Sequence, residues 1–163
     1  MSDQMPEQDS PFATVELDVD ASARCQTAIA IAVDTSYVIQ HIGSITTGIY
    51  MMDNRVENGS TGEGQLELHT VCNPGDRIGF KVYAVDALAN LGDSVVITGF
   101  NVSQGNVFSS DGYPKPQPKQ PDYWIGQASQ GGSQTYQIRI QVTSQSGTKY
   151  NVRWDPFISV TGS

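Results

Sequence analysis

Apolar and polar residues alternate along most of the chain with a period of two, which is the pattern of β-strands that bury one face. The stretch 136–142 shows it most clearly, with Tyr, Ile or Val at even positions and Gln or Arg at odd positions. Similar alternation, or runs of β-branched residues, predicts strands at residues 14–19, 28–33, 45–52, 65–69, 77–84, 95–102, 149–154 and 157–160. We therefore expect a chain of short strands.

The way these strands pair is predicted from the turns and from the absence of helices. Residues 73–76 (Asn-Pro-Gly-Asp) favour a tight turn, so the strands at 65–69 and 77–84 are expected to form a hairpin. Residues 28–33 are apolar at every position, which indicates a central strand covered on both faces. Because no long helical pattern offers a crossover for parallel pairs, antiparallel pairing is expected. The fold class predicted is an all-β antiparallel β-sandwich, jelly-roll or Ig-like, with about eight or nine strands.

The length of 163 residues fits one domain. We expect a flexible N-terminal segment over residues 1–11 and a single β-sandwich domain over residues 12–163. Two segments interrupt the strands: a polar, glycine-bearing loop at 53–64, and a run at 106–120 with prolines at alternate positions. Long loops of this kind are uncommon in compact domains unless they are functional or disordered.

Charge narrows the classes of partner. The chain has 17 acidic residues against 9 Lys and Arg, for a formal net charge of −8, so neither nucleic acid nor a basic membrane-surface helix fits. The N-terminus lacks the pattern of a signal peptide, and the longest apolar run is far shorter than the roughly 20 residues that span a bilayer. We expect a cytoplasmic protein, with release by an unconventional route left open. Cys25 and Cys72 are expected to stay reduced, as small buried apolar side chains.

Residues for catalysis are sparse. The chain has two histidines, His41 and His69, and no Gly-x-Ser-x-Gly motif. His69 is expected to be solvated on the polar face of its strand, and Cys72 has no obvious base beside it. The histidines and cysteines also lack the paired spacing of a structural zinc site. We therefore predict no enzymatic activity, with a hydrolase that uses a pair of acidic residues as an alternative.

The loop at 53–64 carries several hard oxygen ligands of the type that calcium prefers. They are Asp53, Asn54, Glu57 and Asn58, with Glu63 a few residues later. No EF-hand pattern is present, and an acidic loop is often simply solvated. Calcium is therefore a possible ligand of this loop, and no cofactor is required.

A second cluster flanks the proline run and consists of Asp111, Tyr113, Asp122, Tyr123 and Trp124. Aromatic faces stack on the apolar faces of sugars, while carboxylates accept hydrogen bonds from hydroxyls, so this cluster is a candidate ligand-binding site. The alternative is that Tyr123 and Trp124 anchor the long loop on the sandwich, because aromatic rings bury large areas wherever they lie.

Several segments together resemble the PixA/AidA inclusion-body family of bacteria. They are 29–35 (Ile-Ala-Ile-Ala-Val-Asp-Thr), 49–52 (Ile-Tyr-Met-Met), 64–66 (Gly-Gln-Leu), 74–78 (Pro-Gly-Asp-Arg-Ile) and 154–158 (Trp-Asp-Pro-Phe-Ile). Their order and spacing match that family from about residue 26 to residue 160, nearly the whole chain.

This resemblance implies a small bacterial β-sandwich without known catalysis. Members are associated with intracellular inclusions, with stationary-phase or quorum-controlled expression and with host interaction. The chain departs from the methionine-rich founding member in having only 4 Met, and Phe80 lies where many relatives are expected to have tryptophan. The family supplies no established catalytic residues.

The leading hypothesis is a non-enzymatic protein that self-associates into a homo-oligomer and binds a glycan or a host protein. It is supported by the resemblance, by the lack of a catalytic constellation and by outward strand positions rich in Gln, Ser, Thr and Asn. A purely structural or storage protein is the alternative, because edge strands with few charges favour pairing between copies.

Overall fold

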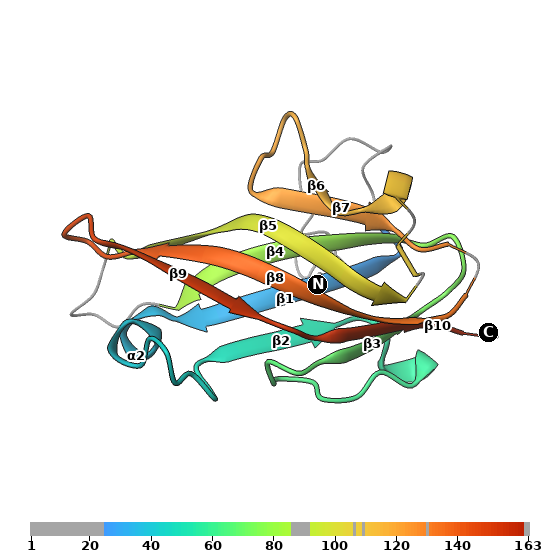
Figure 1. Ribbon diagram of the computed structural model, residues 1–163, viewed down its shortest axis with the longest axis horizontal. Helices are drawn as coiled ribbons and strands as arrows, with labels where there is room; N and C mark the ends of the chain where they lie inside the picture. Colours follow the sequence, from blue (N-terminus) through green and yellow to red (C-terminus); the bar gives the residue numbers. More distant parts are fainter. Residues whose placement is uncertain (1–24, 86–91, 106, 109, 130, 162–163) are drawn as a thin grey trace, which may run out of the picture.

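The computed structural model of this protein describes residues 25–85, 92–105, 107–108, 110–129 and 131–161. Two sheets stack face to face as a sandwich (Figure 1). The first sheet has the strand order β2-β1-β4-β7-β6, where these strands are β2 (Ile49–Asp53), β1 (Thr27–Asp34), β4 (Arg77–Val85), β7 (Tyr123–Gln127) and β6 (Lys115–Pro116). The second sheet has the order β3-β10-β8-β5, with β9 also paired to β8; its strands are β3 (His69–Cys72), β10 (Phe157–Val160), β8 (Ser133–Thr143), β5 (Ser94–Gly105) and β9 (Lys149–Trp154).

Helices are short and lie at the ends of strands. They are α2 (Thr35–Gln40), η2 (Val56–Asn58) and η4 (Ser110–Gly112). The carboxylate of Asp34 caps α2 by accepting from the backbone N–H of Tyr37 at 3.2 Å. Across the described ranges, none of the helices has the length and apolar character that crossing a membrane requires. The predicted all-β sandwich is thus confirmed.

The core lies between the sheets and follows the alternation read from the sequence. In β1 the odd positions Ile29, Ile31 and Val33 are buried, and β8 buries its even positions from Tyr136 to Val142. Each such side chain contributes roughly 1.5–3 kcal/mol by leaving water, so the alternation itself fixes which face of each strand points inward.

Most of the predicted strands are present. The strand predicted from residue 45 begins only at Ile49, because Gly48 has a positive φ of 91° and ends the preceding loop. The strand predicted at 65–69 likewise begins late, at His69. The predicted strand at 14–19 and the flexible segment at 1–11 lie outside the described residues.

The predicted hairpin between 65–69 and 77–84 is wrong. The turn itself forms, with the N–H of Asp76 donating to the carbonyl of Asn73 at 3.1 Å and Gly75 at a φ of 79°. However, it carries the chain from β3 in the second sheet to β4 in the first, so the two strands do not pair with each other. Turn residues determine the local reversal only; here β3 pairs with β10 in one sheet, and β4 pairs with β1 and β7 in the other.

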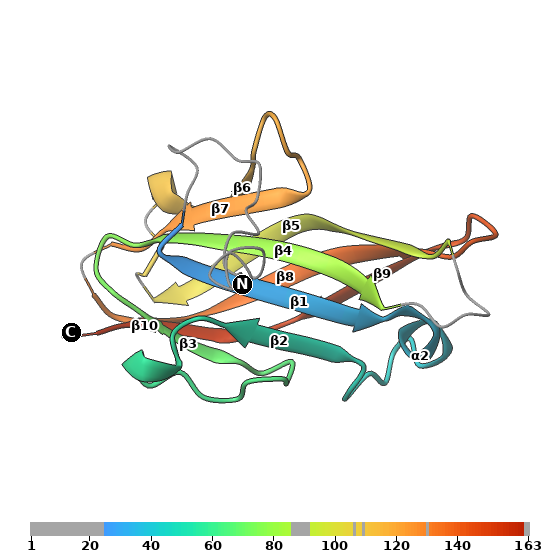
Figure 2. The same ribbon diagram turned by 180° about the vertical axis from the view of Figure 1, so that it is seen from behind.

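The expectation of purely antiparallel pairing also needs correction. Strand β1 runs parallel to β4, from Thr27 opposite Ile78 to Asp34 opposite Val85, and β10 runs parallel to β3. Sequence reasoning assumed that a parallel pair needs a crossover helix. In this fold the connection from β1 to β4 passes instead through β2 and through β3 of the opposite sheet, as Figure 2 shows.

Among the described residues, no second layer covers the outer face of β1, whereas the sequence predicted cover on both faces. Its outward positions are alanines: Ala28 is exposed, and Ala30 and Ala32 are half-buried. Their small size gives an apolar surface that needs no second layer of protein over it.

A buried carboxylate joins three separate segments at one end of the sandwich. Asp76 accepts from the Thr27 hydroxyl at 2.8 Å, from Arg55 Nη2 at 2.6 Å and from the Asn73 N–H at 2.9 Å. Arg55 Nε also donates to Thr27 Oγ1 at 2.9 Å. This Asp76 network links β1, the loop before η2 and the turn before β4.

Candidate functional site

The five residues predicted as one ligand site lie in separate places. Successive residues of β7 point to opposite faces of the sheet, so Tyr123 and Trp124 diverge. The Trp124 ring packs on Phe100 of the second sheet, with ring centroids 5.5 Å apart. The buried Tyr123 lies on the other face, where its hydroxyl donates to Cys25 Sγ at 3.4 Å. These contacts support the alternative that the two rings anchor the strand.

Gly79 makes the position of Tyr123 feasible. A Cβ at residue 79 would overlap the Tyr123 hydroxyl and approach Cys25 Sγ to 2.9 Å, so only glycine leaves room for this pair. Burial is the main cause that raises the pKa of the Tyr123 hydroxyl well above its ordinary value. Burial likewise raises the pKa of the Cys25 thiol. Both groups are therefore held in the neutral form.

Two of the five residues share a shallow hollow of about 160 Å³. Asp111 and the exposed Tyr113 line it together with Gln117 and Gln127, and Arg77 lies at its edge. Asp122 is elsewhere: its side chain is 57% exposed and lies 3.8 Å from the ammonium of Lys81. The structure thus brings Asp111 and Tyr113 together in this hollow, whereas Asp122, Tyr123 and Trp124 lie outside it. Ligand binding by these residues stays a prediction.

The acidic loop brings together two carboxylates. The N–H of Asp53 donates to Glu63 Oε1 at 2.9 Å, and the second oxygens of both side chains are buried without a hydrogen-bond partner. Burial first, and then the neighbouring Asp53, raise the pKa of Glu63. The hydrolase alternative needs such a pair inside a deep pocket, and it stays a prediction.

Two of the other predicted calcium ligands form hydrogen bonds with the protein backbone. Asn54 accepts from the Ala28 N–H at 2.8 Å, and Asn58 Nδ2 donates to the carbonyl of Val71 at 3.0 Å. Glu57 is exposed. In the part of the chain that the structure describes, no three Asp, Glu, His or Cys side chains form a group that could hold a metal. Calcium binding stays a prediction.

Among the residues that the structure describes, the groups suited to nucleophilic catalysis do not assemble into a triad. His69, which we expected to be solvated, is half-buried, and its Nε2 lies 2.8 Å from Ser159 Oγ. No carboxylate within the described ranges hydrogen-bonds to the other ring nitrogen of His69. His41 stacks on Tyr37, and burial raises the pKa of the Cys72 thiol to about 11, so Cys72 is not a thiolate.

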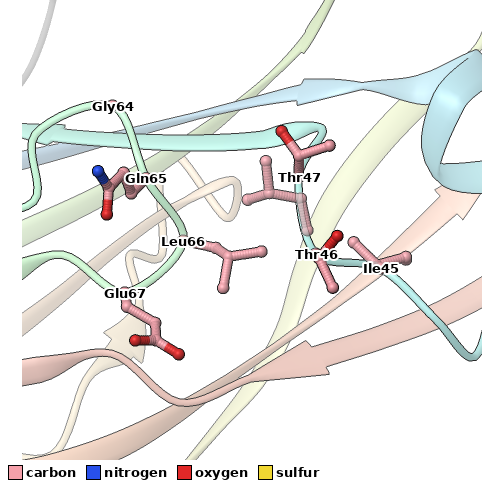
Figure 3. A pocket seen from close by; sticks show the side chains of 8 residues that line it. Ile45, Thr46, Thr47, Gly64, Gln65, Leu66 and Glu67 are labelled. Atoms are coloured by element: carbon pink, nitrogen blue, oxygen red, sulfur yellow. The ribbon is translucent and has the colours of Figure 1, made fainter.

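Sequence reasoning missed a hollow of about 320 Å³ beside β2. Its walls come from two loops, residues 45–47 before β2 and residues 64–67 before β3. Figure 3 shows the Leu66 side chain pointing from the second loop toward Thr46 of the first. Backbone hydrogen bonds hold the second of these loops on β2: Met51 accepts from the Gly64 N–H at 2.7 Å and donates to the Gln65 carbonyl at 3.2 Å. Only the tertiary fold brings these segments together.

Several exposed apolar side chains lie together on the outer face of the first sheet. Its exposed side chains are Tyr50 (39%), Met52 (46%), Tyr83 (45%) and Val85 (53%). The register places Ala32 between Tyr50 and Tyr83, and Ala30 between Met52 and Lys81. The alanines of β1 thus form the floor of a trough with larger side chains on either side. We call these residues, Ala28, Ala30, Ala32, Tyr50, Met52, Tyr83 and Val85, the outer apolar face.

A hollow of about 230 Å³ lies at one end of the outer apolar face, between Met52, Lys81 and Tyr123. Lys81 is the cation here, and its ammonium lies 5.7 Å from the centroid of the Tyr83 ring. The sequence signal for this face was present, since β1 has alanine at every second position, but we interpreted it as a covered strand.

Comparisons with known proteins agree with this fold. Residues 25–148 match the model of a family described as a domain of unknown function, DUF8788. Among solved structures, the chain is similar to the inclusion body protein PixA from Burkholderia cenocepacia J2315, with a TM-score of 0.64 and 18% sequence identity over 88% of this chain and 100% of that chain. No curated protein matches the chain in sequence. The structural similarity shows a shared fold, which confirms the sequence resemblance at that level.

Proposed function

Since the chain belongs to the DUF8788 family and shares its fold with an inclusion body protein, we propose that it is a non-catalytic protein that associates with further copies of itself. The outer apolar face is the surface that joins the copies. The observation that carries this proposal is the row of exposed apolar side chains on β2 and β4, on either side of the alanine floor of β1.

The chemistry of the outer apolar face suits a second copy of the chain. Contiguous apolar patches on soluble proteins mark interaction surfaces, and aromatic residues and Met are enriched in interfaces. A two-fold pair would set this face of one copy against the same face of the other, so that Tyr50 and Tyr83 of each copy enclose apolar side chains of its partner. The exposed apolar side chains of β2 and β4 therefore favour the outer face of this sheet as the surface of association.

The charge of the protein sets how this association responds to salt. Copies with a formal net charge of −8 repel each other, and salt screens that repulsion, while burial of apolar side chains is little affected by moderate salt. We expect association to strengthen as salt is added.

Analytical ultracentrifugation over a range of concentrations tests the proposal. The full-length chain is expected to associate as its concentration rises, and Met52→Glu and Tyr83→Glu are expected to remain monomeric, because each places a charge in the centre of the interface. Val96→Glu is the matched control, since Val96 is 44% exposed on β5 of the second sheet. A chain that stays monomeric throughout, or that Val96→Glu disrupts equally, contradicts the proposal.

A second candidate function is the binding of a neutral polar ligand such as a glycan, or of a host protein bearing one. It is favoured by the exposed ring of Tyr113 beside the carboxylate of Asp111, with the amides of Gln117 and Gln127 in the same hollow. A sugar would stack on the ring and donate hydroxyl hydrogen bonds to the carboxylate.

A glycan array with the purified protein tests this candidate. Binding is expected to be lost in Tyr113→Ala and kept in Phe157→Ala, which removes an exposed ring from the second sheet. An array without signal, or a signal that Tyr113→Ala leaves unchanged, contradicts glycan binding in this hollow without affecting the proposal of self-association.

A further inference from the structure

The outer face of the second sheet carries two arginines side by side. Strands β8 and β9 are antiparallel, and Arg139 lies directly opposite Arg153 in their register, while β5 flanks β8 on its other side (Figure 1). Residues directly opposite each other in such a pair have Cβ atoms about 5 Å apart. We propose that Arg139 and Arg153 form a binding site for an oxyanion group, that is, a phosphate, sulfate or carboxylate, free or carried by a small polar molecule.

The charge distribution makes this pair unusual in an acidic protein. Strands β3, β5, β8, β9 and β10 contain Arg139, Lys149 and Arg153 but no Asp or Glu, although acidic residues outnumber Lys and Arg by 17 to 9 in the chain. Like charges directly across a strand pair are destabilising. Within the described ranges neither arginine has a carboxylate at ion-pair distance; the ion pairs there involve Arg55 and Lys81. A bound anion would relieve this repulsion.

The arginines border a hollow of about 370 Å³ that is rich in hydrogen-bond donors. Thr98 contributes a hydroxyl and Asn151 an amide, and no carboxylate lines the hollow. The Asn151 oxygen accepts from Gln141 Nε2 at 3.3 Å, so its amide N–H groups are left to donate. Guanidinium groups match the geometry of oxyanions with paired N–H groups, and donors without a competing acceptor select for an anion.

One of the guanidinium groups is held in place by the backbone of β5. Arg139 Nη2 lies 3.3 Å from where a Cβ of residue 99 would be, so Gly99 provides the surface on which this group rests. The same nitrogen donates to Asn101 Oδ1 at 3.4 Å. The register of β5 shifts between Ile97 and Gly99, and this irregularity lies next to the hollow. Such bulges frequently direct a side chain at a functional site.

The size of the hollow indicates what carries the oxyanion. Its volume lies at the lower end of the range of small-molecule sites, roughly 300–1,000 Å³, and exceeds what a bare phosphate or sulfate fills. An acidic sugar offers a carboxylate for the arginines and hydroxyls for Thr98 and Asn151. Free oxyanions share the same chemistry with fewer contacts.

Titrations followed by two-dimensional NMR of the full-length protein, at constant ionic strength, test this inference. The probes are inorganic phosphate, sulfate, acetate and glucuronate. We expect saturable shifts of backbone signals around Arg139, Arg153 and Asn151. Tighter binding of glucuronate than of acetate identifies an acidic sugar as the carrier, and equal binding identifies the oxyanion group alone as the recognised element; both results support the site.

Three variants and one control distinguish a specific binding site from non-specific attraction of anions by positive charge. Arg139→Gln and Arg153→Gln are each expected to weaken binding about tenfold or more, because each removes charge-assisted hydrogen bonds. Gly99→Ala keeps every charge, but its methyl group displaces the Arg139 guanidinium, so it too is expected to weaken binding several-fold. Lys149→Gln removes the same charge from the far end of β9 and is expected to have little effect.

Two results would overturn the inference: no saturable shift with any probe, or equal weakening by Lys149→Gln and Arg153→Gln. Both arginines are exposed, so the variants are expected to keep the fold, and their unchanged spectra away from the site verify it. The site lies on the sheet opposite the outer apolar face, so the result stands whether or not the protein self-associates.

Discussion

Replacing Asp76 by alanine is expected to destabilise the protein more than any other single change at a charged residue of the sandwich. The substitution removes an acceptor that serves three donors from three segments: the Thr27 hydroxyl, the Arg55 guanidinium and the Asn73 N–H. Because Asp76 is buried, these donors are left without a partner and with little access to water.

The expected loss in the free energy of unfolding follows from the donors that remain without an acceptor after the substitution. Removing one partner of a buried ion pair costs about 3–5 kcal/mol. The Arg55 side chain is 18% exposed, so water satisfies part of it, and we expect a loss of about 3 kcal/mol for Asp76→Ala. Arg55→Ala leaves Asp76 with two of its donors and is expected to cost about 2 kcal/mol. The double variant is expected to cost little more than Asp76→Ala alone, which corresponds to a coupling energy of about 2 kcal/mol.

Urea unfolding followed by the fluorescence of the buried Trp154 measures these free energies. Asp122→Ala is the matched control, because it removes an aspartate whose ion pair with Lys81 is exposed, and its effect is expected to stay within about 0.5 kcal/mol. The reasoning is refuted if Asp76→Ala costs less than about 1 kcal/mol, or if the losses of the two single variants simply add.

Three further predictions concern buried groups. The raised pKa of Glu63 means that the folded protein holds this proton more tightly than the unfolded chain, so the associated stability is present at low pH and is lost as the pH rises through the raised pKa. Glu63→Gln is therefore expected to raise the free energy of unfolding at neutral pH, and this gain is expected to disappear below pH 4.5, the ordinary pKa of this carboxyl. An equal gain at both pH values in urea unfolding contradicts this. Cys72, with its pKa raised to about 11 by burial, is expected to react with a thiol reagent only as fast as the protein unfolds, and Cys25→Ser isolates this slow reaction from that of the half-buried Cys25. The Tyr136 hydroxyl is buried without a hydrogen-bond partner among the described residues, so Tyr136→Phe is expected to leave the free energy of unfolding unchanged or to raise it by up to about 1 kcal/mol, and a clear loss in the same assay contradicts this.

Most strands of this protein could be predicted from the sequence, but their partners could not. Strands β6 (Lys115–Pro116) and β7 (Tyr123–Gln127) lie in segments for which we predicted no strand. Alternation over 136–142 or 149–154 is a local property, since it depends only on which face of one strand is buried. The partner of β3 depends on β10, almost ninety residues later in the chain, and the Asn-Pro-Gly-Asp turn gave no sign of it. Turn geometry was correctly predicted at residues 73–76, and the pairing drawn from it was wrong.

The same limit applies to the candidate sites. Tyr123 and Trp124 are neighbours in the sequence, yet the pleat of β7 sends their rings to opposite faces of the sheet. Conversely, Arg139 and Arg153 are fourteen positions apart and meet only because of the register between β8 and β9. Residue types indicated which chemistry was available, whereas the register decides which groups meet.

The position of β10 has a consequence for how the protein is made in the cell. This strand, at the end of the chain, lies between β3 and β8 and contributes hydrogen bonds to both. During synthesis, β3 therefore emerges from the ribosome long before its neighbour exists, and its edge stays open until β10, almost ninety residues later, has been made. At high expression, nascent chains with this open edge can meet one another before each is finished, so the rate of translation, and not only the concentration of the finished protein, is expected to influence whether the protein accumulates in dispersed or condensed form.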